Sequence, residues 1–259
     1  MSREFNIDYV FSFIPKMLSY LHITLFIVAS SLVLGLIIGL LVALPRMYNI
    51  PFLKRVSQVY VSFFRGTPIL IQLFLVYYGL PELLKLVDIN SSRWDVLWFA
   101  IATYALNSGA FISEIIRSGV GAVDRGQIEA AQSVGMSGYQ TFTRIILPQA
   151  LAVVVPVFSN LVIGNLKDTS LAFTIGAMEM TGKSQTLGSA TQHFVETYIA
   201  LSLIYLVISL IVQKLFKVLE NTLLRHEHRD SVQKEPAKRK GFVVRYLRSP
   251  RLSKGGKGI

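Results

Sequence analysis

Long runs of apolar residues alternate with short polar segments along most of the chain. Five of these runs are long enough to cross the hydrocarbon core of a bilayer, which takes about 20 helical residues at about 1.5 Å of rise each. They cover residues 19–44, 57–80, 96–116, 149–177 and 197–219. The pattern predicts an all-α integral membrane protein with about five transmembrane helices.

The same pattern divides the chain into three parts. Residues 1–18 form an N-terminal segment that we expect outside the cell, and residues 19–220 form the transmembrane domain. A polar loop at 118–148 interrupts that domain between the third and fourth spans. Residues 221–259 form a basic tail, which we expect to be flexible and cytoplasmic.

Lysine and arginine in the short loops predict the orientation, because cytoplasmic loops carry the excess of both. The loop after the first span holds Arg46, Lys54 and Arg55 and no acid, whereas the next loop is balanced. From Asn221 onward the tail holds 11 Lys and Arg against 3 acids. Basic and non-basic segments alternate, which places the N-terminus outside and both the 118–148 loop and the C-terminus in the cytoplasm of a multi-pass cell-membrane protein.

Composition excludes several function classes. Charged residues make up 16% of the chain, against about 25% in a typical soluble domain. The chain has no cysteine, so it has no disulfide framework and no thiolate site. The net charge of +11 lies mainly in the tail, where no stacking platform or fold motif predicts nucleic-acid binding. We expect the tail to be attracted to anionic lipid head groups, at about 1 kcal/mol per basic residue.

The 118–148 loop contains a short helix bracketed by turns. Asp124 is a typical helix N-cap, and Gly126 suits a turn. Residues 127–134 favour a helix that Gly135 and Gly138 would end. Taken alone, such a helix is either a docking element or an amphipathic helix whose polar face meets solvent.

The spacing within this loop resembles that of a known family. Glu129-Ala130-Ala131 is followed after three residues by Gly135, and after nine more by Ile145, Ile146 and Leu147-Pro148. This register is similar to the EAA motif of the membrane permease subunits of binding-protein-dependent ABC importers. Other strings resemble the branch that takes up polar amino acids: Phe64-Arg65-Gly66-Thr67-Pro68, Ser113-Glu114, Gly126-Gln127, Pro148-Gln149-Ala150 and Leu166-Lys167-Asp168-Thr169-Ser170-Leu171.

The resemblance implies a type I importer permease whose cytoplasmic coupling helix touches a separate ATP-binding subunit. A second permease chain, identical or related, would complete the path, and an extracytoplasmic solute-binding protein would deliver the solute. ATP would be used by the partner, with no cofactor, metal or catalytic residue on this chain. The coupling residues would be Gly126, Glu129, Ala130, Ala131 and Gly135. The solute would be a polar amino acid, and residues 177–180 and 188–193 resemble chains that handle L-cystine.

A second motif imitates a phosphate-binding loop and is rejected. Thr181-Gly182-Lys183-Ser184 ends as such a loop does, but the pattern needs a glycine where Ala177 stands. The predicted orientation also places it outside the cytoplasm. His22 and His193 have no partners at metal-ligand spacing, so we interpret both as structural.

Polar residues inside the spans predict the solute path, because ionisable groups in a membrane are costly and usually face a cavity or a partner. Asp168 suits the ammonium of an amino acid, and Thr169, Ser170 or a helix end suits its carboxylate. Asn107 and Glu114 in the third span are further candidates. The alternative is that Lys167 and Asp168 form a structural pair at the seam of a dimer.

Three smaller expectations concern helix geometry and Arg65. Gly35 and Gly39 either admit a neighbouring helix at close range or are merely tolerated in a lipid-facing helix. Gly164 and Gly176 let the fourth span bend or unwind. Arg65 is expected to extend toward the lipid head groups.

Two other function classes remain open. An integral membrane enzyme would need a constellation such as H-E-x-x-H, which the sequence lacks. A stand-alone channel or carrier is disfavoured by an odd number of spans without an internal repeat.

Overall fold

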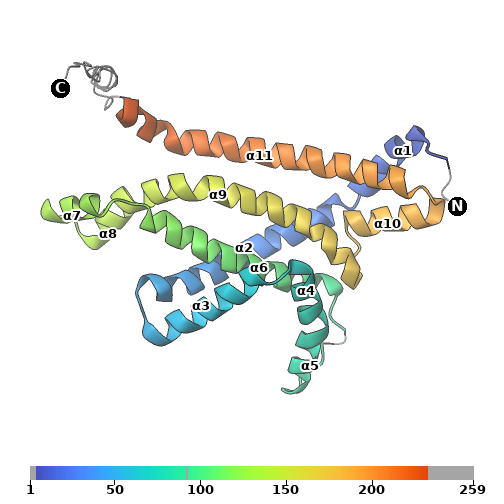
Figure 1. Cartoon of the computed structure of the whole chain (residues 1–259), viewed down its shortest axis with the longest axis horizontal. Helices are drawn as coiled ribbons and strands as arrows, with labels where there is room; N and C mark the ends of the chain where they lie inside the picture. Colours follow the sequence, from blue (N-terminus) through green and yellow to red (C-terminus); the bar gives the residue numbers. More distant parts are fainter. Residues whose placement is uncertain (1–3, 92, 233–259) are drawn as a thin grey trace, which may run out of the picture. The chain divides into compact units, whose positions relative to one another are not determined.

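The computed structural model describes residues 4–91 and 93–232, with side chains described up to residue 222. Within these residues every regular element is helical, so the fold is all-α as predicted (Figure 1). The elements are α1 (Ile7–Leu18), α2 (Leu21–Met47), α3 (Pro51–Gly66), α4 (Ile69–Phe74), η1 (Leu75–Gly79), α5 (Leu80–Lys85), α6 (Val96–Gly121), α7 (Arg125–Ser133), α8 (Gly138–Thr141), η2 (Phe142–Ile146), α9 (Leu147–Asp168), η3 (Thr169–Ile175), α10 (Met180–Thr191) and α11 (Phe194–Val232).

Four stretches are long and apolar enough to cross a membrane: Leu21–Met47, Val96–Gly121, Gly138–Ile175 and Phe194–Thr222. A fifth crossing is possible through the pair of helices Pro51–Gly66 and Ile69–Lys85, between which the chain bends by 112°. The prediction of about five spans is confirmed. The expectation that residues 57–80 form one continuous helix is wrong.

The bend in the second span follows from Thr67-Pro68. A residue before proline is pushed out of the α region, and Thr67 is extended at φ −116° and ψ 148°. The break leaves carbonyl groups without helical partners, and the Gln72 Nε2 amide donates to two of them, those of Phe64 at 2.9 Å and Thr67 at 3.0 Å. The buried Gln72 side chain therefore supplies hydrogen bonds to carbonyl groups that the break leaves unpaired inside the membrane domain.

Helix α6 lies between α2 and α9 and forms the centre of the domain. A Cβ atom on Gly35 would lie 2.9 Å from the Cβ of Ser108, and one on Gly39 would lie 2.6 Å from a methyl carbon of Ile112. The two backbones therefore approach too closely for any side chain at either position. This confirms close approach as the role of Gly35 and Gly39.

The N-terminal segment contains a helix that the sequence analysis did not predict. The N-cap of α1 is Asn6, whose side chain accepts from the amide of Asp8 at 2.9 Å. Val10, Phe13 and Met17 repeat at helical spacing and are buried. They belong to one apolar cluster with Met180, Ala200, Leu201 and Ile204. Helix α1 is therefore part of the packed domain, and the signal was this short i, i+3, i+7 repeat.

The fourth span changes its winding at its end. Helix α9 tightens into the 3₁₀ segment η3 directly after Asp168, and Gly176 ends it at φ +94°. Gly176 thus acts as predicted, since only glycine adopts that region freely. Gly164 lies within continuous α-helix instead. Helix α11 runs past residue 221, where the tail was expected to begin, and residues 233–259 of that tail lie outside the described residues.

Candidate functional site

A cavity of about 560 Å³ lies between α6, α9 and the end of α3. It brings together three of the five residues predicted for the path: Asn107 and Glu114 on α6 and Asp168 at the end of α9. The lining combines the polar side chains of Asn160, Asn165, Ser108 and Ser118 with apolar ones such as Val157, Leu161 and the aromatic ring of Phe111. Such a cavity has the size and the convergent polar groups of a small-molecule site.

Asp168 lies where α9 ends, and its main-chain oxygen accepts a hydrogen bond from the Tyr104 hydroxyl at 2.7 Å. Its carboxylate lines the cavity and makes no hydrogen bond or ion pair among the described residues. The neighbouring Lys167 lines a different hollow, of about 540 Å³, against α11. The two charges therefore face separate spaces.

Thr169 and Ser170 lie outside this cavity. Thr169 is fully buried, and its hydroxyl donates to the carbonyl of Leu166 at 2.7 Å. Ser170 lines the hollow that Lys167 also lines. The 3₁₀ winding after Asp168 turns successive side chains away from the cavity, so these two hydroxyls do not complete a solute site around Asp168.

Two buried amides fix the helices around the cavity. The Asn107 Nδ2 donates to the Gln72 Oε1 at 2.8 Å and thereby ties α6 to the broken second span. The Asn165 Nδ2 donates to the hydroxyls of Ser31 at 3.2 Å and Ser108 at 3.0 Å, which joins α9 to α2 and α6. Each donor amide is thus committed to holding the cavity walls in place.

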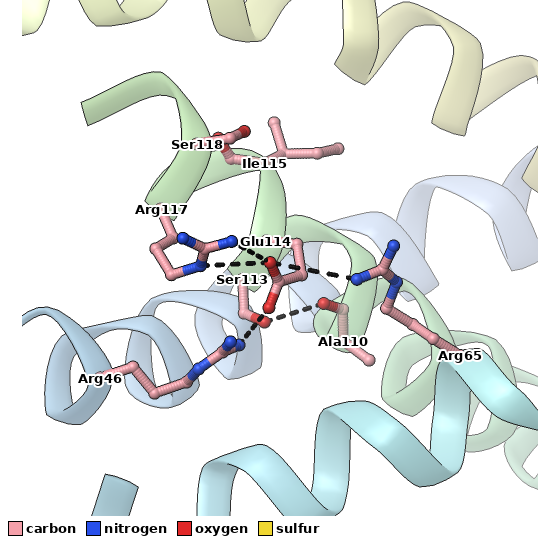
Figure 2. Close-up of polar contacts among 8 residues, drawn as sticks. All are labelled: Arg46, Arg65, Ala110, Ser113, Glu114, Ile115, Arg117 and Ser118. Atoms are coloured by element: carbon pink, nitrogen blue, oxygen red, sulfur yellow. Dashed lines mark hydrogen bonds and ion pairs between the residues drawn. The ribbon is translucent and has the colours of Figure 1, made fainter. Parts of the chain in front are cut away.

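A cluster of charges occupies the other end of the cavity. Figure 2 shows arginines from α2, α3 and α6 around the single carboxylate of Glu114. Arg46 is bonded to one of its oxygens, and Arg117 donates to the other at 2.7 Å. Arg65 stands 4.0 Å from that second oxygen, with its guanidinium 5.4 Å from the ring centre of Phe111.

This cluster changes the interpretation of Glu114 and Arg65. Glu114 lines the cavity, but its carboxylate already has arginine partners. Arg65 lies toward Glu114 and the cavity, so the expectation that it extends toward the head groups is wrong. The sequence analysis missed the cluster because its members come from three helices. Only the i, i+3 spacing of Glu114 and Arg117 could have signalled part of it.

The predicted coupling helix is present as α7. Asp124 caps it, accepting from the amide of Gly126 at 2.6 Å. Gly135 follows its end at φ +82°, a left-handed conformation typical of the position after a helix. Glu129 and Ala130 are exposed, whereas Ala131 is buried. One prediction fails here: Gly138 begins the next helix, α8, behind a capping box formed by Ser137 and Gln140.

The surface around α7 carries large apolar side chains with little cover. Val134 and Tyr139 are each 78% exposed, and Phe142 is 42% exposed. Val134 lies between α7 and α8, and Tyr139 and Phe142 lie at the start of the stretch Gly138–Ile175. With the exposed Glu129 they give this part of the chain apolar and acidic side chains of the kind that interfaces use.

Two buried acids lie near α10, away from both regions. Glu179 is fully buried and accepts from the amides of Thr181 at 2.7 Å and Gly182 at 3.1 Å, so it caps α10. Burial raises the pKa of its carboxyl above the usual value, although these hydrogen bonds oppose the shift. His193 pairs with Glu196 at 2.9 Å and stacks on Tyr9, which agrees with a structural role for this histidine.

Comparison with known proteins extends these observations. Residues 35–225 match the family model described as "Binding-protein-dependent transport system inner membrane component". The L-cystine transport system permease protein TcyL of Bacillus subtilis (strain 168) is 48% identical over 229 residues, which cover 88% of this chain and 96% of that protein. The arginine transport system permease protein ArtQ of the same organism is 37% identical over 211 residues, which cover 81% and 93%.

Solved structures agree. A crystal structure of an amino acid ABC transporter with histidines superposes with a TM-score of 0.75 at 32% identity, covering 85% of this chain and all of that one. A chain of the inward-facing MetNI methionine ABC transporter superposes with a TM-score of 0.62 at 20% identity, covering 80% and 94%. The second likeness supports the fold alone.

Proposed function

The chain belongs to the family of binding-protein-dependent transport system inner membrane components and is a permease subunit of an amino acid ABC transporter, and we propose that it carries L-cystine inward. The solute is inferred from the 48% identity to an L-cystine permease over nearly the whole of both chains. A cavity with an unpartnered carboxylate and an arginine cluster suits a zwitterionic solute. In this mechanism, movement of the α7 loop changes the side on which the cavity opens.

The observation that carries the coupling role is the exposed α7 surface. Glu129 and Ala130 face outward from a helix held at both ends, by the Asp124 cap and by the Gly135 turn. In our proposal a separate cytoplasmic ATP-binding subunit grips this helix together with Val134 and Tyr139. In this proposal ATP is bound by that partner, because the Thr181–Ser184 segment lacks the glycine that the phosphate-loop pattern needs where Ala177 stands.

Closure of the ATP-binding subunits on ATP would pull the α7 helices of two permease chains together. Helix α9 follows α7 through α8 and η2 without a long loop, so movement of α7 would be passed to the helix that carries Asp168. The cavity would then change the side on which it opens. The second chain is either a copy of this one or a relative, and an extracytoplasmic binding protein supplies the solute.

The orientation belongs to this proposal. The N-terminus would lie outside, and the α7 loop and the C-terminus would lie in the cytoplasm, as the distribution of Lys and Arg predicts. Labelling of single cysteines from either side of sealed vesicles tests it directly. Position 129 should react only from the side where ATP is added.

Uptake by reconstituted vesicles tests the function. The complete complex, with its ATP-binding subunit and its binding protein, should accumulate labelled L-cystine only when ATP is supplied on the α7 side. Accumulation without ATP would indicate a stand-alone carrier. ATP-driven accumulation of a different amino acid, with none of L-cystine, would reject the solute and keep the class.

A further inference from the structure

The cavity has a charged group at each of its two ends. Asp168 lies at one end, level with Tyr104, because the Tyr104 hydroxyl bonds its main-chain oxygen. The Glu114 cluster lies toward the other end, where Ser118 also lines the cavity. Tyr104 and Glu114 are separated along α6 by about 15 Å at 1.5 Å per residue, and Asn107 and Phe111 line the wall between them. The cavity is therefore elongated along α6.

The end near Glu114 has an excess of positive charge. Three arginines surround one carboxylate, and Arg46 and Arg117 are the two bonded to it. Of the three, Arg65 is the one that lines the cavity, and its side chain is 45% exposed. A guanidinium carries five N–H donors, and an approach of 4.0 Å to Glu114 leaves most of them unused.

The middle of the cavity offers no further charge. Its walls there are the amides of Asn107, Asn160 and Asn165, the ring of Phe111 and the backbone of Gly164. The amides of Asn107 and Asn165 donate to protein partners, and all three amides are uncharged. A solute must therefore find its charged partners at the ends.

A solute whose only charges are the ammonium and the carboxylate of one α-carbon cannot reach both ends, because the two groups share that carbon. A disulfide-linked pair of amino acids has α-carbons about 5.5–6 Å apart. With an ammonium at one extreme and a carboxylate at the other, its charges span about 10 Å. Adding a hydrogen bond of about 2.8 Å at each extreme gives about 15 Å, which is comparable to the rise along α6 from Tyr104 to Glu114.

We propose that this cavity selects solutes with an aminocarboxylate group at each end, with Asp168 facing the ammonium of one and Arg65 facing the carboxylate of the other. The inference rests on the proposed amino acid transport and assigns Arg65 as a specificity-determining residue. Glu114 is a positioning residue: it holds the arginine cluster at the cavity and does not itself meet the ammonium.

The test measures binding to the permease in its complex with the ATP-binding subunit, in lipid nanodiscs without the binding protein. The probes are L-cystine, S-methyl-L-cysteine with one head, cystamine with two ammonium groups, and 3,3′-dithiodipropionate with two carboxylates. L-cystine should bind at least about tenfold more tightly than each of the other three, since only it satisfies both ends. Equal binding of S-methyl-L-cysteine would overturn the proposal.

Two substitutions separate contact from overall charge. Arg65→Gln should weaken L-cystine binding about tenfold or more and leave that of S-methyl-L-cysteine within about threefold. Arg55→Gln removes the same charge from the same helix at an exposed position outside the cavity lining, and should change L-cystine binding less than about threefold. Arg65→Lys should restore part of the loss. Equal effects of the Arg65→Gln and Arg55→Gln substitutions would overturn the assignment of Arg65.

The outcomes also distinguish this inference from the proposed function on which it rests. Should Arg65→Gln fail to assemble, the four probes on the unaltered complex still decide between one-headed and two-headed solutes. Uptake of a one-headed amino acid with ATP, without preference for L-cystine, would reject only the inference. No ATP-driven uptake of any amino acid would reject the proposed function itself.

Discussion

The α7 loop and the cavity contrast in how the chain builds them. The loop is one stretch of consecutive residues closed by local hydrogen bonds, such as that from the Gly126 amide to Asp124. The cavity takes Arg65, Glu114 and Asp168 from three separate helices, which meet only because α3 and α9 both pack against α6. A change in the loop should therefore act locally, whereas a change in helix packing should reach the whole cavity.

The largest effect is expected from Gly39→Leu. Its side chain would enter the space of Ile112, whose methyl carbon already lies 2.6 Å from the position of a Cβ. Overpacking in a tight interface costs about 1–3 kcal/mol, and a leucine against a helix backbone should lie at or above the upper end. We expect loss of most folded protein, measured as the monodisperse fraction and the melting temperature in detergent.

Gly79→Leu is the matched control, because nothing lies within 4 Å of a Cβ at that position. Its melting temperature should stay within a few degrees of that of the unaltered protein. If both substitutions lowered the amount of folded protein equally, the fold around the cavity would not depend on the contact of α2 with α6.

Glu129→Lys should separate the two regions most cleanly. It reverses a charge on the exposed face of α7 and leaves the cavity intact. Loss of a charged contact at an interface costs about 2–5 kcal/mol, so ATP-driven uptake should fall at least about tenfold. Solute binding to the detergent-purified complex should stay unchanged.

Gln132→Lys provides a comparison for Glu129, since it also places a lysine at an exposed position of α7 but changes the charge by one unit, whereas Glu129→Lys changes it by two. Its uptake should fall less than that of Glu129→Lys. Normal uptake by vesicles carrying Glu129→Lys would remove this residue from the coupling surface.

Asp168→Asn should show the converse pattern. The carboxylate that faces the cavity becomes neutral while its size is kept, so solute binding should weaken by about 2 kcal/mol, or about thirtyfold. Binding of the ATP-binding subunit, measured by co-purification, should stay unchanged. Unaltered solute affinity would exclude Asp168 from the path.

Gly135→Ala should give the smallest effect. At φ +82° a Cβ costs about 1–2 kcal/mol, although nothing lies within 4 Å to obstruct it. The melting temperature should fall by a few degrees, and uptake should fall modestly because α7 is less well oriented. Gly121→Ala, which has neither a positive φ nor a neighbour within 4 Å, should leave both unchanged.

The same contrast explains what could be predicted from the sequence. The spans, the Asp124 cap and the turn at Gly135 depend on neighbouring residues, so periodicity and local chemistry identified them. Gly138 was misjudged because Ser137 and Gln140 form a capping box that starts a new helix there. Asp168 could be singled out because charge in a span is itself a signal, and the structure places it in the cavity lining.

The arginine cluster could not be predicted in this way. Arg46, Arg65 and Glu114 are distant in sequence, and their meeting depends on the crossing of three helices. Thr169 and Ser170 were assigned to the path by adjacency to Asp168, but the change to 3₁₀ winding directs them elsewhere. The periodicity of a single sequence shows neither how distant helices cross nor where a helix changes to 3₁₀ winding.

Site-specific photo-cross-linking tests the central claim, that α7 is where the ATP-binding subunit grips this chain. A photoreactive residue at exposed Ala130 should yield an adduct with the ATP-binding subunit of the reconstituted complex, in an amount that changes when ATP is added. The same residue at Val87, which is 63% exposed between the second and third spans, should yield none. No adduct from position 130, or equal adducts from both positions, would contradict the account.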